Sequence, residues 1–117
     1  MILASQIITI LVAIIHTYFL ILEMFLWTEP KGMKAFGLKK DFAEKTKVLA
    51  ANQGLYNGFL AAGLLWSVFT ANLHTRLFFL SCVIIAGCYG YYSLKKIKVF
   101  YIQAVPAIIS LIITTLI

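Results

Sequence analysis

The sequence predicts an all-α membrane protein, a four-transmembrane-helix bundle, and three observations support this fold class. The 117-residue chain is 62% hydrophobic and only 12% charged, far outside the range of soluble globular domains. Its apolar residues form long continuous runs, whereas a β-barrel would show short alternating segments. Its basic residues gather in two of the connections between these runs. Lipid is therefore the expected solvent.

Four apolar windows are long enough to cross a bilayer, because a helix needs about 20 mainly apolar residues for the roughly 30 Å hydrocarbon layer. The first window has no basic stretch before it and no small-residue cleavage pattern after it, so we expect a retained helix and not a signal peptide. We expect one membrane domain over residues 1–117, with a cytoplasmic loop at 28–41 and helices at about 2–27, 42–70, 77–93 and 99–117.

The basic residues also predict the topology. Of the ten, nine lie in the first and third connections: Lys31, Lys34, Lys39, Lys40, Lys45, Lys47, Lys95, Lys96 and Lys98. The positive-inside rule assigns both connections to the cytoplasm, so both termini are expected outside. The expected partners of these lysines are the bilayer and its anionic lipid headgroups. Nucleic acid is not expected, since no surface with interleaved aromatic and basic residues is evident.

Local signals predict where helices begin, end and bend. Pro30 should end the first helix. Asp41 followed by Glu44 has the character of a capping box, so the second helix is expected to begin near Phe42. Pro106 frees a backbone carbonyl and predicts a bend in the fourth helix.

Two ionisable residues interrupt the first apolar run, in the stretch HTYFLILEMFLW. His16 and Glu23 lie about 10.5 Å apart along a helix axis, so they share a face but cannot hydrogen-bond directly. A carboxyl group in hydrocarbon is costly and usually marks a path for ions, protons or substrates, so Glu23 is the first candidate functional residue. Structural hydrogen bonding is the alternative, and it is the stronger one for His16, because one or two neighbours satisfy a neutral imidazole.

Depth in the membrane groups further polar residues with these two. Counting inward from the cytoplasmic ends predicts two stacked layers of ligand- or proton-binding residues. The layer nearer the cytoplasm contains Glu23, Gln53, Tyr89 and Gln103, and the central layer contains His16 and Asn57, at the depth of Ser110. Interhelical hydrogen bonding without a ligand is the alternative for the amides.

Small residues recur every four positions on the second helix, at Ala50, Gly54, Gly58 and Ala62. Such a ridge lets another helix approach closely and predicts helix packing, either within one bundle or between the copies of a homo-oligomer.

No metal or cofactor is expected. Cys82 and Cys88 are six residues apart and point in different directions on a helix, so they make no ligand pair. Buried in a helix bundle, they are most simply small apolar side chains.

The stretches HTYFLILEMFLWTEPKGMKAFGL and ANQGLYNGFLAAGLLWS, in this order, resemble a family of small bacterial integral membrane proteins, domain of unknown function 1304. The similarity runs over nearly the whole chain. It implies a compact four-helix, multi-pass protein of the bacterial cytoplasmic (inner) membrane. It implies no reaction, ligand or catalytic residue.

Three functions stay open. The favoured one is a small transport or ligand-binding protein, homo-oligomeric, whose polar layer handles a small solute or a proton. The second is a membrane-embedded enzyme for a lipid-like or isoprenoid substrate, with Glu23 as acid or base and His16 orienting or shuttling a proton. The third is a scaffold or accessory subunit without chemistry. The enzyme is less favoured because the sequence has no phosphate loop, nucleophile elbow or HExxH pattern.

Overall fold

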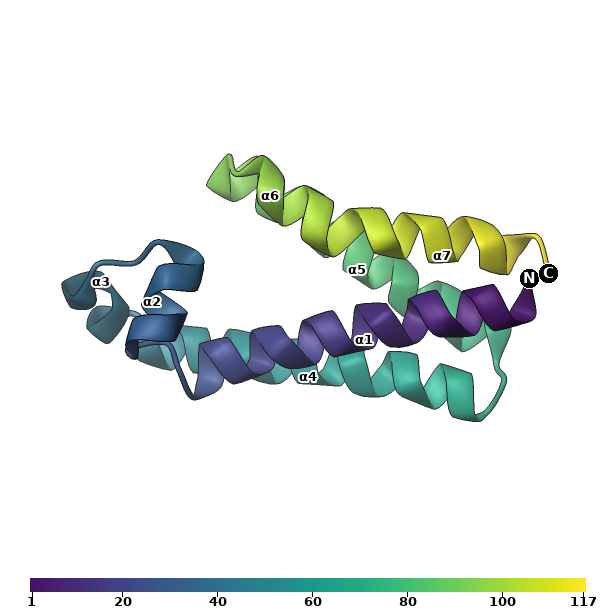
Figure 1. Ribbon diagram of the computed structural model, residues 1–117, viewed down its shortest axis with the longest axis horizontal. Helices are drawn as coiled ribbons and strands as arrows, with labels where there is room; N and C mark the ends of the chain where they lie inside the picture. Colours follow the sequence, from purple (N-terminus) through teal and green to yellow (C-terminus); the bar gives the residue numbers. More distant parts are fainter. The chain divides into compact units, whose positions relative to one another are not determined.

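The computed structural model describes residues 1–117 and contains helices and no strands (Figure 1). Its elements are α1 (Ile2–Met24), α2 (Pro30–Phe36), α3 (Lys40–Lys45), α4 (Lys47–Phe69), α5 (Leu73–Leu94), α6 (Ile97–Val99), the π-helical segment η1 (Phe100–Ala104) and α7 (Val105–Thr115). The predicted all-α class is confirmed.

Three helical stretches are long and apolar enough to cross a membrane: Ile2–Met24, Leu73–Leu94 and Ile97–Thr115. They correspond to the first, third and fourth windows of the sequence. Helix α4, in the second window, is 23 residues long but is not among these three. A count of four spans therefore stays a prediction.

The chain forms two compact units. The first, which we call the hairpin unit, is His16–Phe59. The second, the terminal unit, combines Met1–Ile15 with Leu60–Ile117. Helices α1 and α4 contribute residues to both units.

In the hairpin unit, the short helices α2 and α3 connect α1 with α4 (dark blue in Figure 1). Helix α1 ends at Met24, earlier than the predicted end near residue 27. Helix α2 begins at Pro30, whose fixed φ suits the first helical turn. It ends at Phe36 and is followed by the cap residue Gly37, whose φ of 65° belongs to the left-handed region that glycine adopts without a steric penalty. The N–H groups of Gly37 and Leu38 donate to the carbonyls of Lys34 and Met33, which caps this end of α2.

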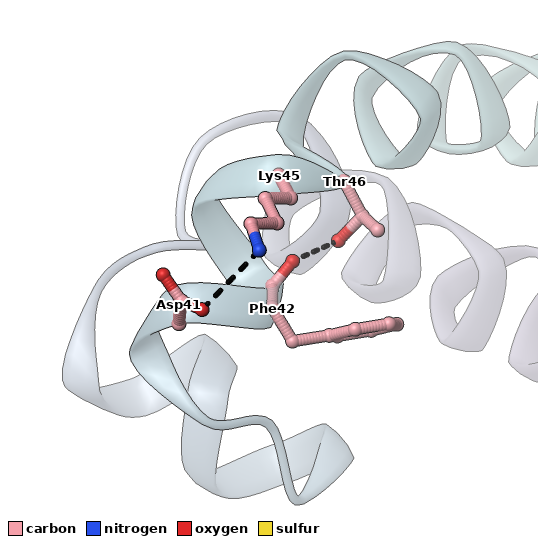
Figure 2. Close-up of polar contacts among 4 residues, drawn as sticks. All are labelled: Asp41, Phe42, Lys45 and Thr46. Carbon is pink, nitrogen blue, oxygen red and sulfur yellow. Dashed lines mark hydrogen bonds and ion pairs between the residues drawn. The ribbon is translucent and has the colours of Figure 1, made fainter.

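The second predicted helix is divided at Thr46, where α3 ends and α4 follows. The Thr46 hydroxyl donates a hydrogen bond to the Phe42 carbonyl at 2.7 Å (Figure 2). The same hydroxyl oxygen accepts one from the Trp27 indole Nε1 at 3.0 Å. Thr46 thus ties the chain that follows α1 to the junction between α3 and α4.

Asp41 makes a different contact from the one that the sequence predicts. The N-cap of α3 is Lys39, and no side chain caps this helix end. The Asp41 carboxylate instead lies 3.4 Å from the Lys45 ammonium group, one turn along α3 (Figure 2). Both side chains are exposed, so this ion pair adds little to stability.

In the terminal unit, α1 runs antiparallel to α7, and the two chain ends lie side by side (Figure 1). The Ser5 and Thr114 hydroxyls are hydrogen-bonded at 2.6 Å. One turn further along α1, and one turn back along α7, the Thr9 and Ser110 hydroxyls are bonded at 2.8 Å. All four residues are buried, so these two pairs fix the register of the two helices.

The apolar core of the terminal unit begins next to these hydroxyl pairs along α1 and α7. Its buried residues come from α1, α4, α5 and α7: Val12, Ala13, Ala61, Leu64, Leu80, Val83 and Ala107. Several of them are alanines, and small side chains allow helix backbones to approach closely in membranes.

Segment η1 widens the last predicted helix just before Pro106. Proline has no N–H, and its ring would clash with the carbonyl four residues earlier in a regular α-helix. The π-helical segment accommodates the proline, and the Val105 N–H bonds the Phe100 carbonyl five residues back. Helix α5 packs tightly on η1, because a Cβ at Gly87 would lie 2.9 Å from the Ala104 Cβ and 3.1 Å from its backbone nitrogen.

We predict that Gly87→Ala destabilises the protein by about 1–3 kcal/mol, because the added methyl meets backbone and Cβ atoms that cannot rotate away. Thermal unfolding in detergent measures the loss. The control is Gly58→Ala, whose added Cβ would meet the end of the Leu20 side chain at 2.6 Å, a group that can turn aside. Both changes share the same gain in helix propensity, so equal losses would contradict this packing.

Candidate functional site

The hairpin unit brings a carboxyl group and an amide together, with the carboxyl inside a candidate membrane span. The Asn57 Nδ2 donates a hydrogen bond to the Glu23 Oε1 at 2.5 Å. Asn57 lies on α4 and is only 5% exposed, whereas Glu23 lies near the end of α1 and is half-buried. No ion pair involves Glu23, so the amide is the polar partner of its carboxyl group.

The close approach of α1 and α4 makes this hydrogen bond possible. A Cβ at Gly54 would lie 3.1 Å from the Glu23 Cβ and 3.2 Å from the Leu20 carbonyl oxygen. A larger residue at position 54 would therefore push the helices apart. Asn57 is three residues further along α4, on the same face as Gly54, so its short side chain reaches the carboxyl group.

Residues of the small-residue ridge differ in their surroundings. Gly54 and Gly58 of the hairpin unit face α1, where the Leu20 backbone and side chain approach them. Ala50 is 6% exposed, whereas Ala62, in the terminal unit, is exposed.

The remaining predicted site residues of the hairpin unit do not gather around Glu23. His16 is fully buried, and its ring packs edge-on against Phe19 with a centroid distance of 5.6 Å. Gln53, which the sequence places in the same layer as Glu23, is exposed. Asn57, which the sequence places at the depth of His16, is the residue that bonds Glu23.

Tyr89 and Gln103 belong to the terminal unit. The Tyr89 side chain is 66% exposed. Gln103 is half-buried within η1, and its Oε1 would lie 3.9 Å from a Cβ at Gly90 of α5. Ser110, which the sequence places in the central layer, instead bonds Thr9 in the hydroxyl pairs between α1 and α7.

A second polar cluster, centred on Arg76, lies in the terminal unit. The third helix is predicted from the sequence to begin at residue 77, which leaves Arg76 just outside it, near the second connection. Helix α5 begins at Leu73 instead, since the side chain of Asn72 accepts a hydrogen bond from the Thr75 N–H and caps the helix. Arg76 therefore lies within α5, and it is only 1% exposed.

The Arg76 guanidinium contacts two other helices. Its Nη1 donates to the Ser5 Oγ at 2.8 Å, and its Nη2 donates to the Ser67 carbonyl at 3.5 Å. Ser5 also bonds Thr114, and the Ser110 hydroxyl donates to the Ser5 carbonyl at 3.3 Å. A connected polar cluster thus joins α1, α4, α5 and α7.

Among residues 1–117, no group of three or more His, Cys, Asp or Glu side chains could hold a metal ion. Cys82 and Cys88 are free thiols; Cys82 is half-buried and Cys88 is exposed.

Comparison with known proteins gives a family and one relative. The family model described as "Protein of unknown function (DUF1304)" matches residues 10–115. The uncharacterized protein YpaA of Lactococcus lactis subsp. lactis (strain IL1403) is 32% identical over 110 residues, which cover 91% of this chain and 92% of YpaA. No solved structure matches the chain.

We predict an energetic coupling of about 0.6–2 kcal/mol between Glu23 and Asn57, the range of interhelical hydrogen bonds in membrane proteins. A double-mutant cycle of Glu23→Ala and Asn57→Ala, followed by reversible unfolding in mixed micelles, measures it. The control is Asn52→Ala, because the Asn52 amide bonds only the Val48 carbonyl of its own helix. The coupling of Asn52 with Glu23 should be near zero, and equally small values for both asparagines would refute the contact.

Proposed function

We propose a transport or ligand-binding function for this chain, which belongs to the DUF1304 family of proteins of unknown function. The proposed site is Glu23, which would bind a proton or a small solute within the membrane. The observation that carries the proposal is the hydrogen bond from Asn57 to Glu23, because it joins a carboxyl group in a candidate span to a buried amide.

The geometry of the pair suits reversible binding. Asn57 donates to Oε1 and so fixes the orientation of the carboxyl group. Asn57 bonds only Oε1 of this group, so we propose that Oε2 takes a proton, a cation or a hydrogen-bond donor of a solute. The half-buried position of Glu23 gives such a ligand a way in, whereas fully buried His16 has none.

We also propose that α4 is a fourth span. Its 23 residues extend about 35 Å, enough to cross the hydrocarbon layer. Large apolar and aromatic side chains are exposed along it and need a lipid or protein partner: Leu55, Tyr56, Phe59, Trp66 and Phe69.

In this arrangement both termini lie outside the bacterial cytoplasmic membrane, and the lysines of the hairpin unit meet anionic headgroups at the cytoplasmic face. Lys31, Lys34, Lys39 and Lys40 are all exposed, which supports their contact with headgroups. Four short helices enclose little volume. We therefore propose that a second copy of the chain is needed to form a path for the proton or solute across the membrane.

We predict that Glu23→Gln abolishes potential-driven proton uptake into vesicles that contain the purified protein. Glutamine keeps the size of the side chain and an oxygen that accepts from Asn57, so the fold is retained while the titrating group is lost. Uptake is followed with a pH-sensitive dye trapped inside the vesicles.

Glu29→Gln is the matched control, because Glu29 is exposed and lies outside α1. It should transport like the unaltered protein. If Glu23→Gln retains full uptake, and also retains any small molecule that co-purifies with the unaltered protein, the site does not act as proposed.

A further inference from the structure

Arg76 is a buried charge with no acidic side chain in its unit. Its side chain is 1% exposed, and no ion pair involves it. The terminal unit contains no aspartate or glutamate, because the four acidic residues of the chain lie in the hairpin unit: Glu23, Glu29, Asp41 and Glu44. Buried charges in proteins are normally paired, so an anion is the missing element.

On one edge of the guanidinium, the N–H donors lack good hydrogen-bond acceptors. Nη1 donates one short hydrogen bond, to the Ser5 hydroxyl at 2.8 Å. Nη2 has only a long contact of 3.5 Å to the Ser67 carbonyl, and buried Nε has no acceptor at all. The Nε–H and the adjacent Nη2–H form the side edge of the planar guanidinium, which matches two oxygens of one oxyanion.

The surroundings of Arg76 also suit an oxyanion. Ser5 and Thr114 are hydrogen-bonded to each other beside it, and hydroxyl protons can rotate to donate to an anion. Arg76 lies three residues after the first residue of α5, or about 4.5 Å along the helix axis. Since Leu73–Leu94 is a candidate span, this depth is close to that of lipid phosphates, at the opposite end of α5 from Lys95.

We propose that Arg76 binds a phosphate oxyanion through its Nε–Nη2 edge, with the hydroxyl of Ser5 or Thr114 as a further donor. The phosphate belongs either to a phospholipid headgroup or to free inorganic phosphate, which present the same oxygens to the guanidinium. Because Nε is buried, binding requires the side chains that cover it to move apart. The inference does not rest on the role of Glu23, which lies in the other unit.

A direct test uses the fact that Arg76 is the only arginine of the chain. Protein labelled with ¹⁵N-arginine therefore gives a single side-chain Nε–H resonance. The labelled protein, in a maltoside detergent, is titrated separately with dihexanoyl phosphatidylglycerol, with dihexanoylglycerol, which lacks the phosphate, and with sodium phosphate.

We expect a saturable shift of this resonance with a phosphate-bearing compound and none with dihexanoylglycerol. A shift with the phospholipid alone identifies a headgroup, and a shift with inorganic phosphate identifies the free anion. Absence of a saturable shift with both phosphate compounds overturns the proposal, and so does an equal shift with dihexanoylglycerol.

Variants test the role of the guanidinium edge. Arg76→Gln should lose the phosphate-dependent binding, and Arg76→Lys should weaken it, because an ammonium group keeps the charge but lacks the two-donor edge. Lys98→Gln is the control, since Lys98 is an exposed basic residue of the same unit. Binding is measured as phospholipid retained in native mass spectrometry. A folded Arg76→Gln protein that retains phospholipid like the unaltered protein refutes the site; if this variant does not fold, the titration of the unaltered protein decides.

Discussion

The hydroxyl pairs Ser5–Thr114 and Thr9–Ser110 set the register of α1 against α7, and the arrangement of the terminal unit depends on them. Lipid does not drive helices together as water does, so close packing and interhelical hydrogen bonds must supply the association. The register places small core residues next to these pairs and brings Ser5 within reach of Arg76. One set of short polar side chains therefore aligns two helices and holds the charged residue of a third.

In the hairpin unit, close packing and an interhelical hydrogen bond also hold the helices together, through different residues. One hydrogen bond joins its carboxyl and amide groups across α1 and α4, and Gly54 allows the helices to approach closely enough. The two polar clusters are opposite in character, since one contains a carboxyl group and the other a guanidinium. The family to which the chain belongs carries no assigned activity, so function must be argued from these groups.

The helical class was predictable because long apolar runs admit few alternatives in lipid. Glu23 is a candidate from the sequence because an acid in such a run is exceptional, and its functional role stays a prediction. The hydrogen-bond partner of Glu23 was not predicted. Counting inward from helix ends pairs Glu23 with Gln53, whereas the structure pairs it with Asn57, one turn further along α4. The count assumes that both helices stop at one depth, but α1 ends at Met24 and the helical path continues through α3 into α4.

The Arg76 cluster was not predicted, again because the end of a helix was inferred from hydrophobicity alone. An apolar run starting at Leu77 leaves Arg76 just outside the predicted helix, although the cap at Asn72 starts α5 a full turn earlier. Hydrophobicity marks the part of a helix that faces lipid, whereas capping chemistry marks where the helix begins. The sequence does contain a pattern that indicates this cluster. Hydroxyl residues recur four positions apart on the first helix, at Ser5 and Thr9, and on the last helix, at Ser110 and Thr114.

The central proposal is that Glu23 binds a proton or a small solute within the membrane, and a carboxyl group that takes up a proton there should react with a reagent dissolved in the lipid. Dicyclohexylcarbodiimide, an apolar reagent that partitions into lipid, tests it most directly when the protein is treated in membranes and the modified residues are identified by peptide mass spectrometry. The account predicts modification of Glu23, with Glu29, Asp41 and Glu44 left unmodified because they are exposed and outside the candidate spans. Modification of those three residues, with Glu23 unmodified, would contradict it.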